Sequence, residues 1–260
     1  MNILAQLADH ARERVAAAKK KISPEEIRAA AEKMPRGDFP FNRVLAKPSL
    51  SFICECKKAS PSKGIIAEEF PYKEIAAEYA AAGADAISVL TEPKYFLGSS
   101  EYLRQIATTV NVPCLRKDFT VDEYMIYEAK TLGAAAVLLI VAILDKTELA
   151  EYMAVADSLG LSALVEAHDA TEIETALTAG AKIIGVNNRN LKNFAVDTGT
   201  SLALRKLVPP DVLFVAESGI TSATDAKKAH DAGADAVLIG ETHMRAANKG
   251  AKLKELKSLL

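Results

Sequence analysis

The octapeptide GADAISVL, residues 83–90, decides how this sequence folds, because near copies of it return along the chain. The copies are GAAAVLLI from Gly133, GAKIIGV from Gly180 and GADAVLIG from Gly233, so successive copies start 50, 47 and 53 residues apart. Each copy follows a stretch of helical character and begins with glycine, the favoured residue just past the end of a helix. A short aliphatic run typical of a buried strand comes next. The repeat therefore predicts a unit made of a helix and a strand.

Four further segments between the copies also have the character of strands. They are residues 50–57 (LSFICECK), 112–119 (VPCLRKDF), 161–167 (LSALVEA) and 211–218 (DVLFVAES). Strands that alternate with helices pair in parallel, and eight such units in about 200 residues are what a (β/α)8 TIM barrel requires. A doubly wound sheet is the alternative, but it would want a G-x-G-x-x-G turn, and none follows any of these strands.

A helical extension is expected before the first strand. We assign residues 1–48 to this extension and residues 49–260 to the catalytic barrel, the two together making a single domain. Helices are expected at residues 2–20 and 24–33, followed by a loop. The segment SPEE at residues 23–26 has the serine, proline and glutamate of a helix start with a capping box. The extension either plugs one end of the barrel or covers its active end, and the sequence leaves both open.

The bulk composition excludes several classes of function. The chain has 260 residues and a formal net charge of −2, so no overall field attracts nucleic acid or an anionic membrane. Its longest apolar run, residues 134–144, is shorter than the roughly 18 residues of a membrane span, and the charged N-terminal segment is unlike a signal peptide. Cys54, Cys56 and Cys114 are an odd number of cysteines. We therefore expect reduced packing thiols and a cytoplasmic protein.

Charged side chains stand at the ends of four predicted strands. Glu55 and Lys57 share one face of the first strand, because side chains alternate along a strand. The third, fifth and seventh strands end in the same way, at Lys117, Glu166 and Glu217. Alternate strands of a TIM barrel contribute to one interior layer, and the C-terminal mouth carries the active site. We therefore expect these residues to meet there and to perform general acid–base catalysis.

Two alternatives stay open for these charges. Each side chain by itself could reach solvent at a strand end, although the recurrence on four alternate strands disfavours that interpretation. A metal site is the weaker alternative, because the lysines already supply positive charge and the nearest histidine, His168, stands alone. The sixth strand adds Asn187 and Arg189 to the same mouth.

The turns after the last two strands are candidates for a phosphate site. Ser218 and Gly219 follow the seventh strand, and Gly240 and Glu241 follow the eighth. Glycine lets backbone N–H groups approach an anion, and these two loops are the usual phosphate cradle of the fold. Ser60, after the first strand, lies beside the eighth strand in a closed barrel. Ser60 and Lys57, which comes from the same strand end, are therefore expected to complete the cradle.

Eight stretches, taken in order and spacing, resemble the indole-3-glycerol-phosphate synthase family of tryptophan biosynthesis. They are ECKKASPSKG (55–64), TEPKYFLGS (91–99), LRKDF (115–119), LLIVAIL (138–144), LVEAHD (164–169), IGVNNRNL (184–191), VAESGI (215–220) and LIGETHMRA (238–246). The resemblance covers nearly the whole chain. It implies a lyase that closes the indole ring of 1-(2-carboxyphenylamino)-1-deoxyribulose 5-phosphate, with release of CO2 and water and without cofactor or metal. Another phosphosugar barrel enzyme and a non-catalytic phospholigand-binding protein are the alternatives.

The resemblance also implies a catalytic role for each matching position. Lys117 matches the general acid that protonates the ribulose carbonyl. Glu166 matches the carboxylate that stabilises the cationic ring intermediate or takes a proton. Glu55 and Lys57 match the pair that serves the later proton transfers and the dehydration.

Binding roles follow from the same resemblance. Asn187 matches a residue that binds substrate hydroxyls, Arg189 one near the anthranilate carboxylate and Glu217 one that orients the substrate. The positions implied for the apolar pocket of the anthranilate ring are Phe96, Phe119, Leu138 and Ile140. The positions implied for phosphate contacts are Ser60, Ser218, Gly219, Gly240 and Glu241. Thr242 and His243 depart from the family pattern, which has a small residue followed by Leu, Phe or Ala.

Two further expectations concern the surroundings of the site. Residues 60–64 (SPSKG) break the first strand and begin a long loop, before a helix near Tyr72, that we expect to move when substrate binds. The partners that the resemblance implies are the small-molecule phosphosugar substrate and, in association, other enzymes of the tryptophan pathway, with no nucleic acid and no membrane.

Overall fold

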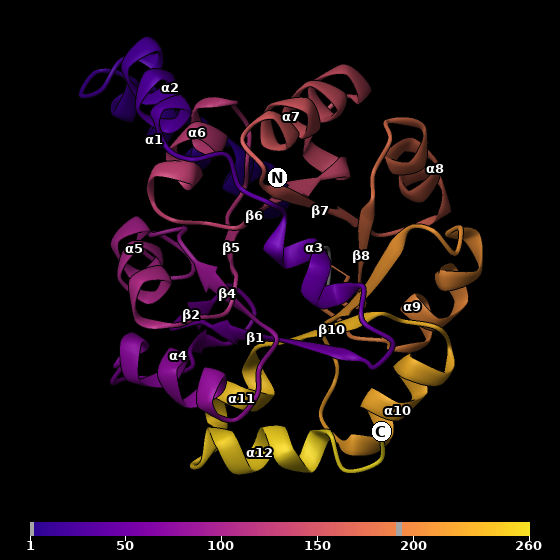
Figure 1. Cartoon of the computed structure of the whole chain (residues 1–260). Helices are drawn as coiled ribbons and strands as arrows, with labels where there is room; N and C mark the ends of the chain where they lie inside the picture. The colour runs from indigo at the N-terminus through magenta and orange to yellow at the C-terminus, as the bar shows by residue number, and fades with distance from the viewer. Residues whose placement is uncertain (1–2, 191–193) are drawn as a thin grey trace.

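A closed barrel of eight parallel strands forms the centre of the computed structural model, which describes residues 3–190 and 194–260 (Figure 1). The strands are β1 (Ser51–Cys56), β4 (Ala86–Leu90), β5 (Cys114–Lys117), β6 (Ala136–Ile140), β7 (Ser162–Ala167), β8 (Ile183–Asn187), β9 (Leu213–Glu217) and β10 (Ala236–Ile239). They follow one another around the ring in chain order, and β1 closes it against β10, with Ile53 opposite Leu238. The predicted (β/α)8 barrel is confirmed.

Helices surround the barrel on its outer face (Figure 1). They are α4 (Tyr72–Ala81), α5 (Ser100–Thr109), α6 (Tyr124–Thr131), α7 (Lys146–Ser158), α8 (Ala170–Thr178), α9 (Gly199–Leu204), α10 (Ala223–Asp231), α11 (Glu241–Arg245) and α12 (Lys249–Leu256), with 3-10 turns η1 (Val141–Ile143) and η2 (Arg205–Leu207). The four glycines that open the repeats have φ between 85° and 92°. This left-handed conformation ends a helix without steric cost only at glycine, which explains why the repeat marks each helix-to-strand turn.

The N-terminal segment forms three helices: α1 (Ile3–Lys19), α2 (Pro24–Lys33) and α3 (Pro40–Leu45). The first two confirm the predicted helices, apart from residue 2, which lies outside the described residues. The capping box at the start of α2 is also present. The prediction of a plain loop after α2 is wrong, because α3 forms there. This helix has only six residues, too few for the sequence to show a period.

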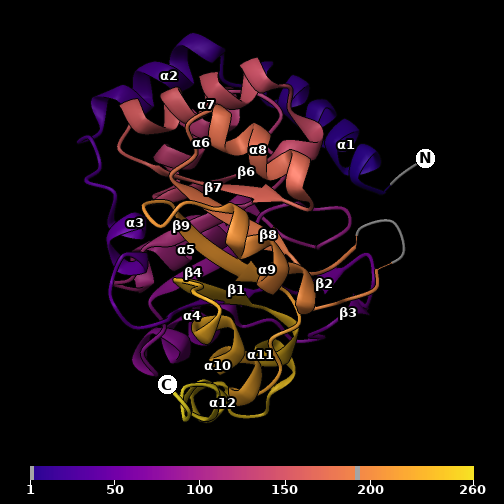
Figure 2. The ribbon, with the colours of Figure 1, turned by 90° about the vertical axis from the view of Figure 1, so that its right-hand side faces the viewer.

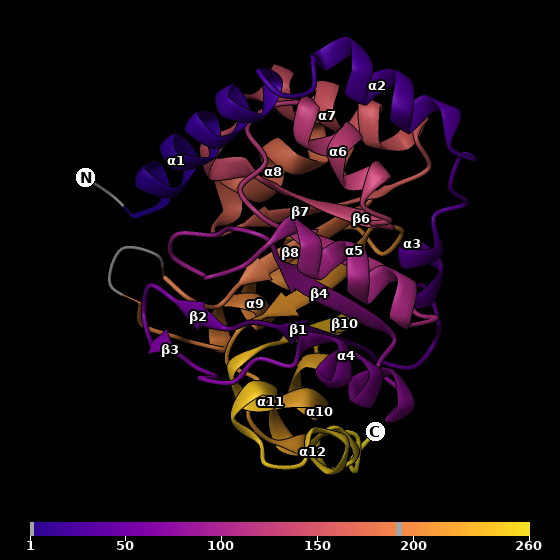
Figure 3. The same ribbon diagram turned by 90° about the vertical axis from the view of Figure 1, so that its left-hand side faces the viewer.

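The extension reaches both ends of the barrel, as the two side views show (Figures 2 and 3). Helix α3 lies at the end where the strands begin. Ser51, the first residue of β1, donates a hydrogen bond to the carbonyl of Val44 at 2.7 Å, and the N–H of Asn42 donates to Ser162, the first residue of β7, at 3.2 Å. Helix α1 lies at the opposite end, where Ile3 contributes to the mouth cavity. The extension therefore both plugs the end of the barrel where the strands begin and covers part of the opposite mouth.

The segment after β1 is partly ordered into a small hairpin. Strands β2 (Ala59–Ser60) and β3 (Gly64–Ile65) pair in antiparallel fashion, with Ser60 opposite Gly64. The hairpin lies within the long loop that was expected here, and the next helix, α4, begins at Tyr72 as expected. Gly64 has φ of 62°, a left-handed conformation that suits the hairpin turn. Movement of this segment on substrate binding stays a prediction.

The three cysteines are buried free thiols, as the sequence analysis expected. Strands β1, β4 and β6 are buried along their whole length. This is characteristic of parallel strands that are covered on both faces. Within the described ranges, every helix is too short or too polar to cross a membrane.

Candidate active site

A cavity of about 790 Å³ opens at the C-terminal end of the barrel. It brings together every candidate residue from the sequence analysis: Glu55, Lys57, Ser60, Phe96, Lys117, Phe119, Leu138, Ile140, Glu166, Asn187, Arg189, Glu217, Ser218, Gly219, Gly240 and Glu241. Two lining residues from α1, Ile3 and Leu7, were not among the candidates. No local signal in the sequence places a helix that precedes the barrel over its mouth.

The ammonium group of Lys117 lies between two carboxylates at the centre of this cavity. Its Nζ is 3.1 Å from Oε2 of Glu166 and 3.5 Å from Oε2 of Glu217. Both carboxylates are buried, with relative exposures of 2% and 1%. The three residues come from the ends of β5, β7 and β9, so the expected meeting of alternate strand ends takes place.

Opposing charges keep Lys117 and Glu166 ionised. Burial by itself would lower the pKa of Lys117, but the carboxylates of Glu166, Glu217 and Glu55 outweigh burial and raise it. Burial would likewise raise the pKa of Glu166, but the charge of Lys117 and contacts with His168 lower it well below its usual range. At neutral pH the centre therefore holds a proton donor opposite a carboxylate.

The pKa of Glu217 is shifted in the opposite direction from that of Glu166. Burial raises its pKa well above the ordinary value, and although Lys117 opposes this, the neighbouring carboxylates add to it. Its Oε1 is buried and has no hydrogen-bond partner among the residues that the structure describes. Gly185 on β8 makes room for this oxygen, because a Cβ at that position would overlap it. Glu217 is thus the most readily protonated carboxyl group of the centre, and Gly185 is a residue that the sequence analysis missed.

Glu55 and Lys57 form a second charged pair at the end of β1. Nζ of Lys57 lies 2.5 Å from Oε1 of Glu55, and the hydroxyl of Ser88 lies 3.5 Å from Oε2. The pair lies against Gly240, where a Cβ would overlap the same Oε1. Gly240 therefore gives space to this pair, a reason for glycine that is separate from the expected contact with phosphate.

His168 lies beside the central carboxylate. Its Nε2 is 3.3 Å from Oε1 of Glu166, and its Nδ1 is 2.9 Å from Oε2 of Glu172 on α8. Burial would lower the pKa of His168, but the two carboxylates raise it to about 10. The interpretation that His168 stands alone is wrong. Nevertheless, no group of three or more His, Cys, Asp or Glu side chains suited to a metal ion occurs within residues 3–190 and 194–260.

The turn after β9 has an unusual backbone. Ser218 and Gly219 have φ of 65° and 84°. A positive φ is strained for serine and is found mainly where surrounding contacts enforce it. Here the side-chain amide of Asn188 donates to the carbonyl of Ser218 at 3.0 Å, and Thr242 donates to the carbonyl of Ile220 at 2.9 Å. The bond from Thr242 joins the two turns that were expected to bind phosphate.

Positive charge gathers beside these turns around Glu241. Its carboxylate lies 3.1 Å from Arg245, 3.6 Å from Lys63 and 3.9 Å from Arg189. The three cations come from α11, the hairpin and the chain after β8. Together they give this side of the cavity a positive field suited to an anion.

Thr242 and His243, the two residues after Glu241 that depart from the family pattern, both make contacts that hold the fold together. Thr242 makes the hydrogen bond to Ile220 described above. His243 is fully buried, and its ring centroid lies 5.3 Å from that of Tyr79. Burial, assisted by Lys252 and Lys249, lowers the pKa of His243 to about 4. The histidine is therefore a neutral packing residue beneath the turn.

The opposite side of the cavity is apolar. The ring centroids of Phe96 and Phe119 lie 6.0 Å apart with a tilt of 39°. Leu138 and Ile140 project from β6, and Leu7 of α1 lines the same cavity. This arrangement suits a planar aromatic group, since offset and tilted ring contacts are favourable at such separations.

The fold and this cavity define a TIM-barrel enzyme whose mouth holds a cluster of buried charges between an apolar side and the turns after β9 and β10. A family model described as "Indole-3-glycerol phosphate synthase" matches residues 4–256, and the chain belongs to that family.

Two curated relatives carry the same name. The protein of Ruminiclostridium cellulolyticum is 53% identical over 256 residues, which is 98% of each chain. That of Endomicrobium trichonymphae is 57% identical over 219 residues, 84% of each chain.

Solved structures of other proteins share the barrel. A 3-hexulose-6-phosphate synthase superposes with a TM-score of 0.67 at 18% identity, over 81% of this chain and 100% of the other. A thiamine phosphate pyrophosphorylase from Pyrococcus furiosus gives 0.61 at 15% identity, over 84% and 96%. At these identities the likeness concerns the fold alone.

Proposed function

We propose that this chain closes the indole ring of 1-(2-carboxyphenylamino)-1-deoxyribulose 5-phosphate and releases CO2 and water to give indole-3-glycerol phosphate. The observation that carries this proposal is the position of Lys117, between the carboxylates of Glu166 and Glu217. The apolar and the anion-binding parts of the cavity flank this centre. A substrate with an aryl group at one end and a phosphate at the other fits that order.

Ring closure is assigned to Lys117 and Glu166. The aryl carbon that bears the carboxylate attacks the ketone carbon, so negative charge develops on the ketone oxygen and positive charge in the ring and its nitrogen. Lys117 donates its proton to that oxygen, and the ionised Glu166 stabilises the positive charge. Because both groups are held in their charged forms before substrate arrives, no reorganisation is needed in the transition state.

Decarboxylation follows from the loss of aromaticity. The carbon that attacked is tetrahedral, and when its bond to the carboxylate breaks, the electron pair returns to the ring and to the positively charged nitrogen. The leaving group is CO2. The ring itself is the electron sink of this step.

Dehydration is assigned to the Glu55–Lys57 pair. The hydroxyl made in ring closure leaves as water and needs a proton, while the neighbouring carbon must lose one. Lys57 and Glu55, 2.5 Å apart, are suited to these two transfers. Glu217, with its raised pKa, and Asn187 are assigned to the substrate hydroxyls.

The two ends of the substrate are assigned to opposite walls. Phe96, Phe119, Leu138 and Ile140 take the aryl ring, and Arg189 is the candidate partner of its carboxylate. The phosphate is assigned to backbone N–H groups of Ser218, Gly219, Gly240 and Glu241, with the hydroxyl of Ser60. A cytoplasmic location and association with other enzymes of tryptophan biosynthesis belong to the same proposal, since the family resemblance implies them.

The decisive experiment follows indole formation by fluorescence with the carboxyphenylamino-ribulose phosphate as substrate. The chain has no tryptophan, so the background emission is low. Lys117→Ala and Glu166→Ala are expected to lower kcat by about 10²–10⁴-fold, the usual contribution of a positioned acid or base, and to keep the native circular dichroism spectrum. Lys58→Ala and Glu174→Ala, outside the cavity, are the matched controls.

Three outcomes would contradict the assignment. Near-normal turnover in either cavity variant would remove that residue from the mechanism. Tight phosphate binding without turnover by the wild type would favour a non-catalytic phospholigand-binding protein. Covalent trapping of Lys57 or Lys117 by borohydride in the presence of substrate would favour a Schiff-base aldolase.

A further inference from the structure

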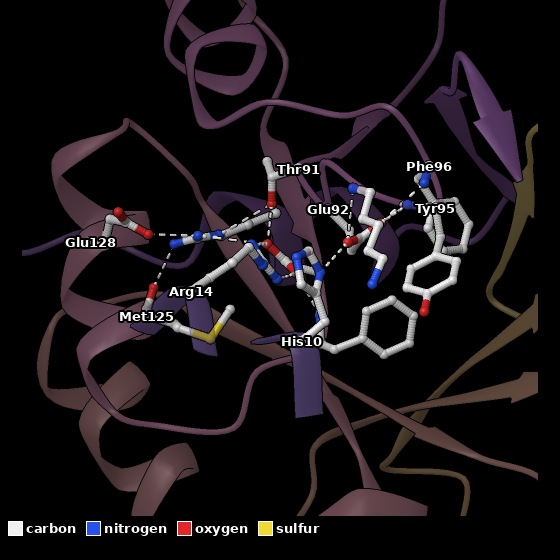
Figure 4. A network of polar contacts seen from close by, with 12 residues as sticks. His10, Arg14, Thr91, Glu92, Tyr95, Phe96, Met125 and Glu128 are labelled. Carbon is white, nitrogen blue, oxygen red and sulfur yellow. Dashed lines mark hydrogen bonds and ion pairs between the residues drawn. The ribbon is translucent and has the colours of Figure 1, made fainter. Parts of the chain in front are cut away.

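A buried carboxylate, Glu92, lies beside Phe96, behind the apolar side of the cavity (Figure 4). It follows β4, and its side chain has no solvent exposure. Its two oxygens accept the backbone N–H groups of residues 94–96 at 3.0, 2.7 and 3.0 Å. Glu92 thereby fixes the turn that presents Phe96 to the cavity.

A second buried carboxylate, Asp118, lies next to Phe119 on the same apolar side of the cavity. It follows Lys117 and accepts the backbone N–H of Phe119 at 2.8 Å. From the barrel side, Thr91 donates to it at 2.6 Å, and Arg116 lies 3.6 Å away. Its position therefore affects both the aromatic wall and the strand end that carries the central lysine.

Both carboxylates are paired with basic residues of one helix, α1. Nδ1 of His10 lies 2.8 Å from Oε1 of Glu92. The guanidinium of Arg14 contacts both oxygens of Asp118, at 2.6 and 3.1 Å. Figure 4 shows these two side chains reaching from α1 into the network. They are four residues apart, so they occupy the same face of the helix.

The same face of α1 also reaches the cavity itself. Ile3 and Leu7 precede His10 by seven and three residues, a spacing that places all three on one side of a helix. Ile3 and Leu7 line the cavity. One helix face thus combines direct apolar contact with the cavity and polar contacts to the turns that carry Phe96 and Phe119.

We infer that His10 and Arg14 are positioning residues for the aryl end of the substrate: their pairing with Glu92 and Asp118 fixes the turns that carry Phe96 and Phe119 and places α1 over the ring. This inference rests on the proposed function for the identity of the ring. The phosphate side of the cavity makes no use of this network. The inference therefore predicts a selective effect on one end of the substrate.

The network allows the test without loss of the fold. When Arg14 is removed, Asp118 keeps its contacts with Arg116, Thr91 and the N–H of Phe119. When His10 is removed, Glu92 keeps its three backbone partners. The variants His10→Ala and Arg14→Ala are therefore expected to fold. They should differ from wild type in how rigidly the turns that carry Phe96 and Phe119 are held.

The experiment compares two ligands on His10→Ala, Arg14→Ala and the double variant. Anthranilate probes the aryl side and is followed by its own fluorescence; inorganic phosphate probes the other side and is followed by calorimetry. Arg12→Ala is the matched control, because Arg12 is on the same helix but its side chain is 56% exposed and pairs with Asp9. Arg14→Lys tests whether charge without the bidentate geometry suffices. Thermal unfolding is recorded for every variant.

The inference expects each alanine variant to weaken anthranilate binding and to raise the substrate KM by about 5- to 20-fold, as for loss of a charge-assisted hydrogen bond. Phosphate affinity is expected to change less than twofold, and Arg14→Lys to recover part of the loss. Equal weakening of both ligands, or unchanged anthranilate binding, would overturn it. The anthranilate and phosphate readouts are equilibrium bindings that need no turnover, so absence of turnover in wild type would refute the proposed function without deciding this inference.

Discussion

Nε2 of His168 lies 3.3 Å from Oε1 of Glu166. The catalytic carboxylate proposed here is therefore bounded by two cations, the imidazolium on this side and the ammonium of Lys117 on the other. Glu172 holds the far nitrogen of the same imidazole at 2.9 Å. Three consecutive groups, carboxylate, imidazolium and carboxylate, thus continue outward from the reaction centre to α8.

Replacing His168 should change the pH dependence of catalysis. In His168→Asn one of the cations that lower the pKa of Glu166 is absent, so that pKa rises. The acidic limb of the kcat/KM profile is expected to move to higher pH. The control is His230→Asn, on α10 and away from the cavity. An unshifted acidic limb would show that Glu166 does not need this neighbour.

The same substitution should alter stability in a pH-dependent way. The pKa of His168 is raised in the folded protein from 6.5 to about 10, so its protonation favours the folded state. This contribution is complete below pH 6.5 and is lost as the pH rises towards 10. Urea unfolding of wild type and His168→Asn at several pH values should therefore show a difference in free energy of unfolding that shrinks between pH 6.5 and 10. A constant difference would contradict the raised pKa.

Gly185 should be intolerant of any side chain. In Gly185→Ala the new Cβ overlaps Oε1 of Glu217, so the carboxyl group must leave its position beside Lys117. We expect kcat/KM to fall at least about tenfold and the free energy of unfolding to fall by about 1–3 kcal/mol, the usual cost of overpacking. Gly250→Ala in α12 is the control, since its Cβ would lie at an ordinary 3.4 Å from Ala82. Full activity in Gly185→Ala would show that Glu217 does not need this position.

A substitution in α3, at the end of the barrel where the strands begin, should lower stability and leave substrate binding unchanged. Phe41 in α3 is completely buried, so Phe41→Ala is expected to cost about 3–5 kcal/mol of unfolding free energy. The KM of the folded fraction should stay unchanged, because α3 lies at the opposite end from the cavity. Urea unfolding and steady-state kinetics test both statements. Leu207→Ala, at a half-exposed site, is the control. A raised KM would reveal communication between the two ends.

The sequence predicts the barrel and its mouth because both depend on local patterns. The glycines of the repeat mark every second helix-to-strand turn, and a charge at the end of an apolar strand is visible without any knowledge of its neighbours. Alternation then decides which residues share a face. Glu55, Lys117, Glu166 and Glu217 could therefore be assigned to one layer.

The rest of the site depends on contacts between distant segments. Gly185 has no local signal, since its lack of a side chain matters only because Glu217 occupies the space. His168 looks solitary in the sequence. Its raised pKa depends on Glu172, four residues further along the chain, and on Glu166, which only the fold brings close. The short helix α3 and the hairpin after β1 are too brief to show a period.

The position of α1 has a consequence for how the molecule forms. His10 and Arg14 are 82 and 104 residues ahead of their carboxylate partners, and β1 finds its second neighbour only in β10. During synthesis the first helix therefore emerges long before any surface exists to receive it, and the ring closes only when the last strand is made. Contacts of such large sequence separation slow folding. The segment that shapes the substrate's surroundings is thus among the first to be translated, but it can dock only after β5 and the turn that follows it have been made.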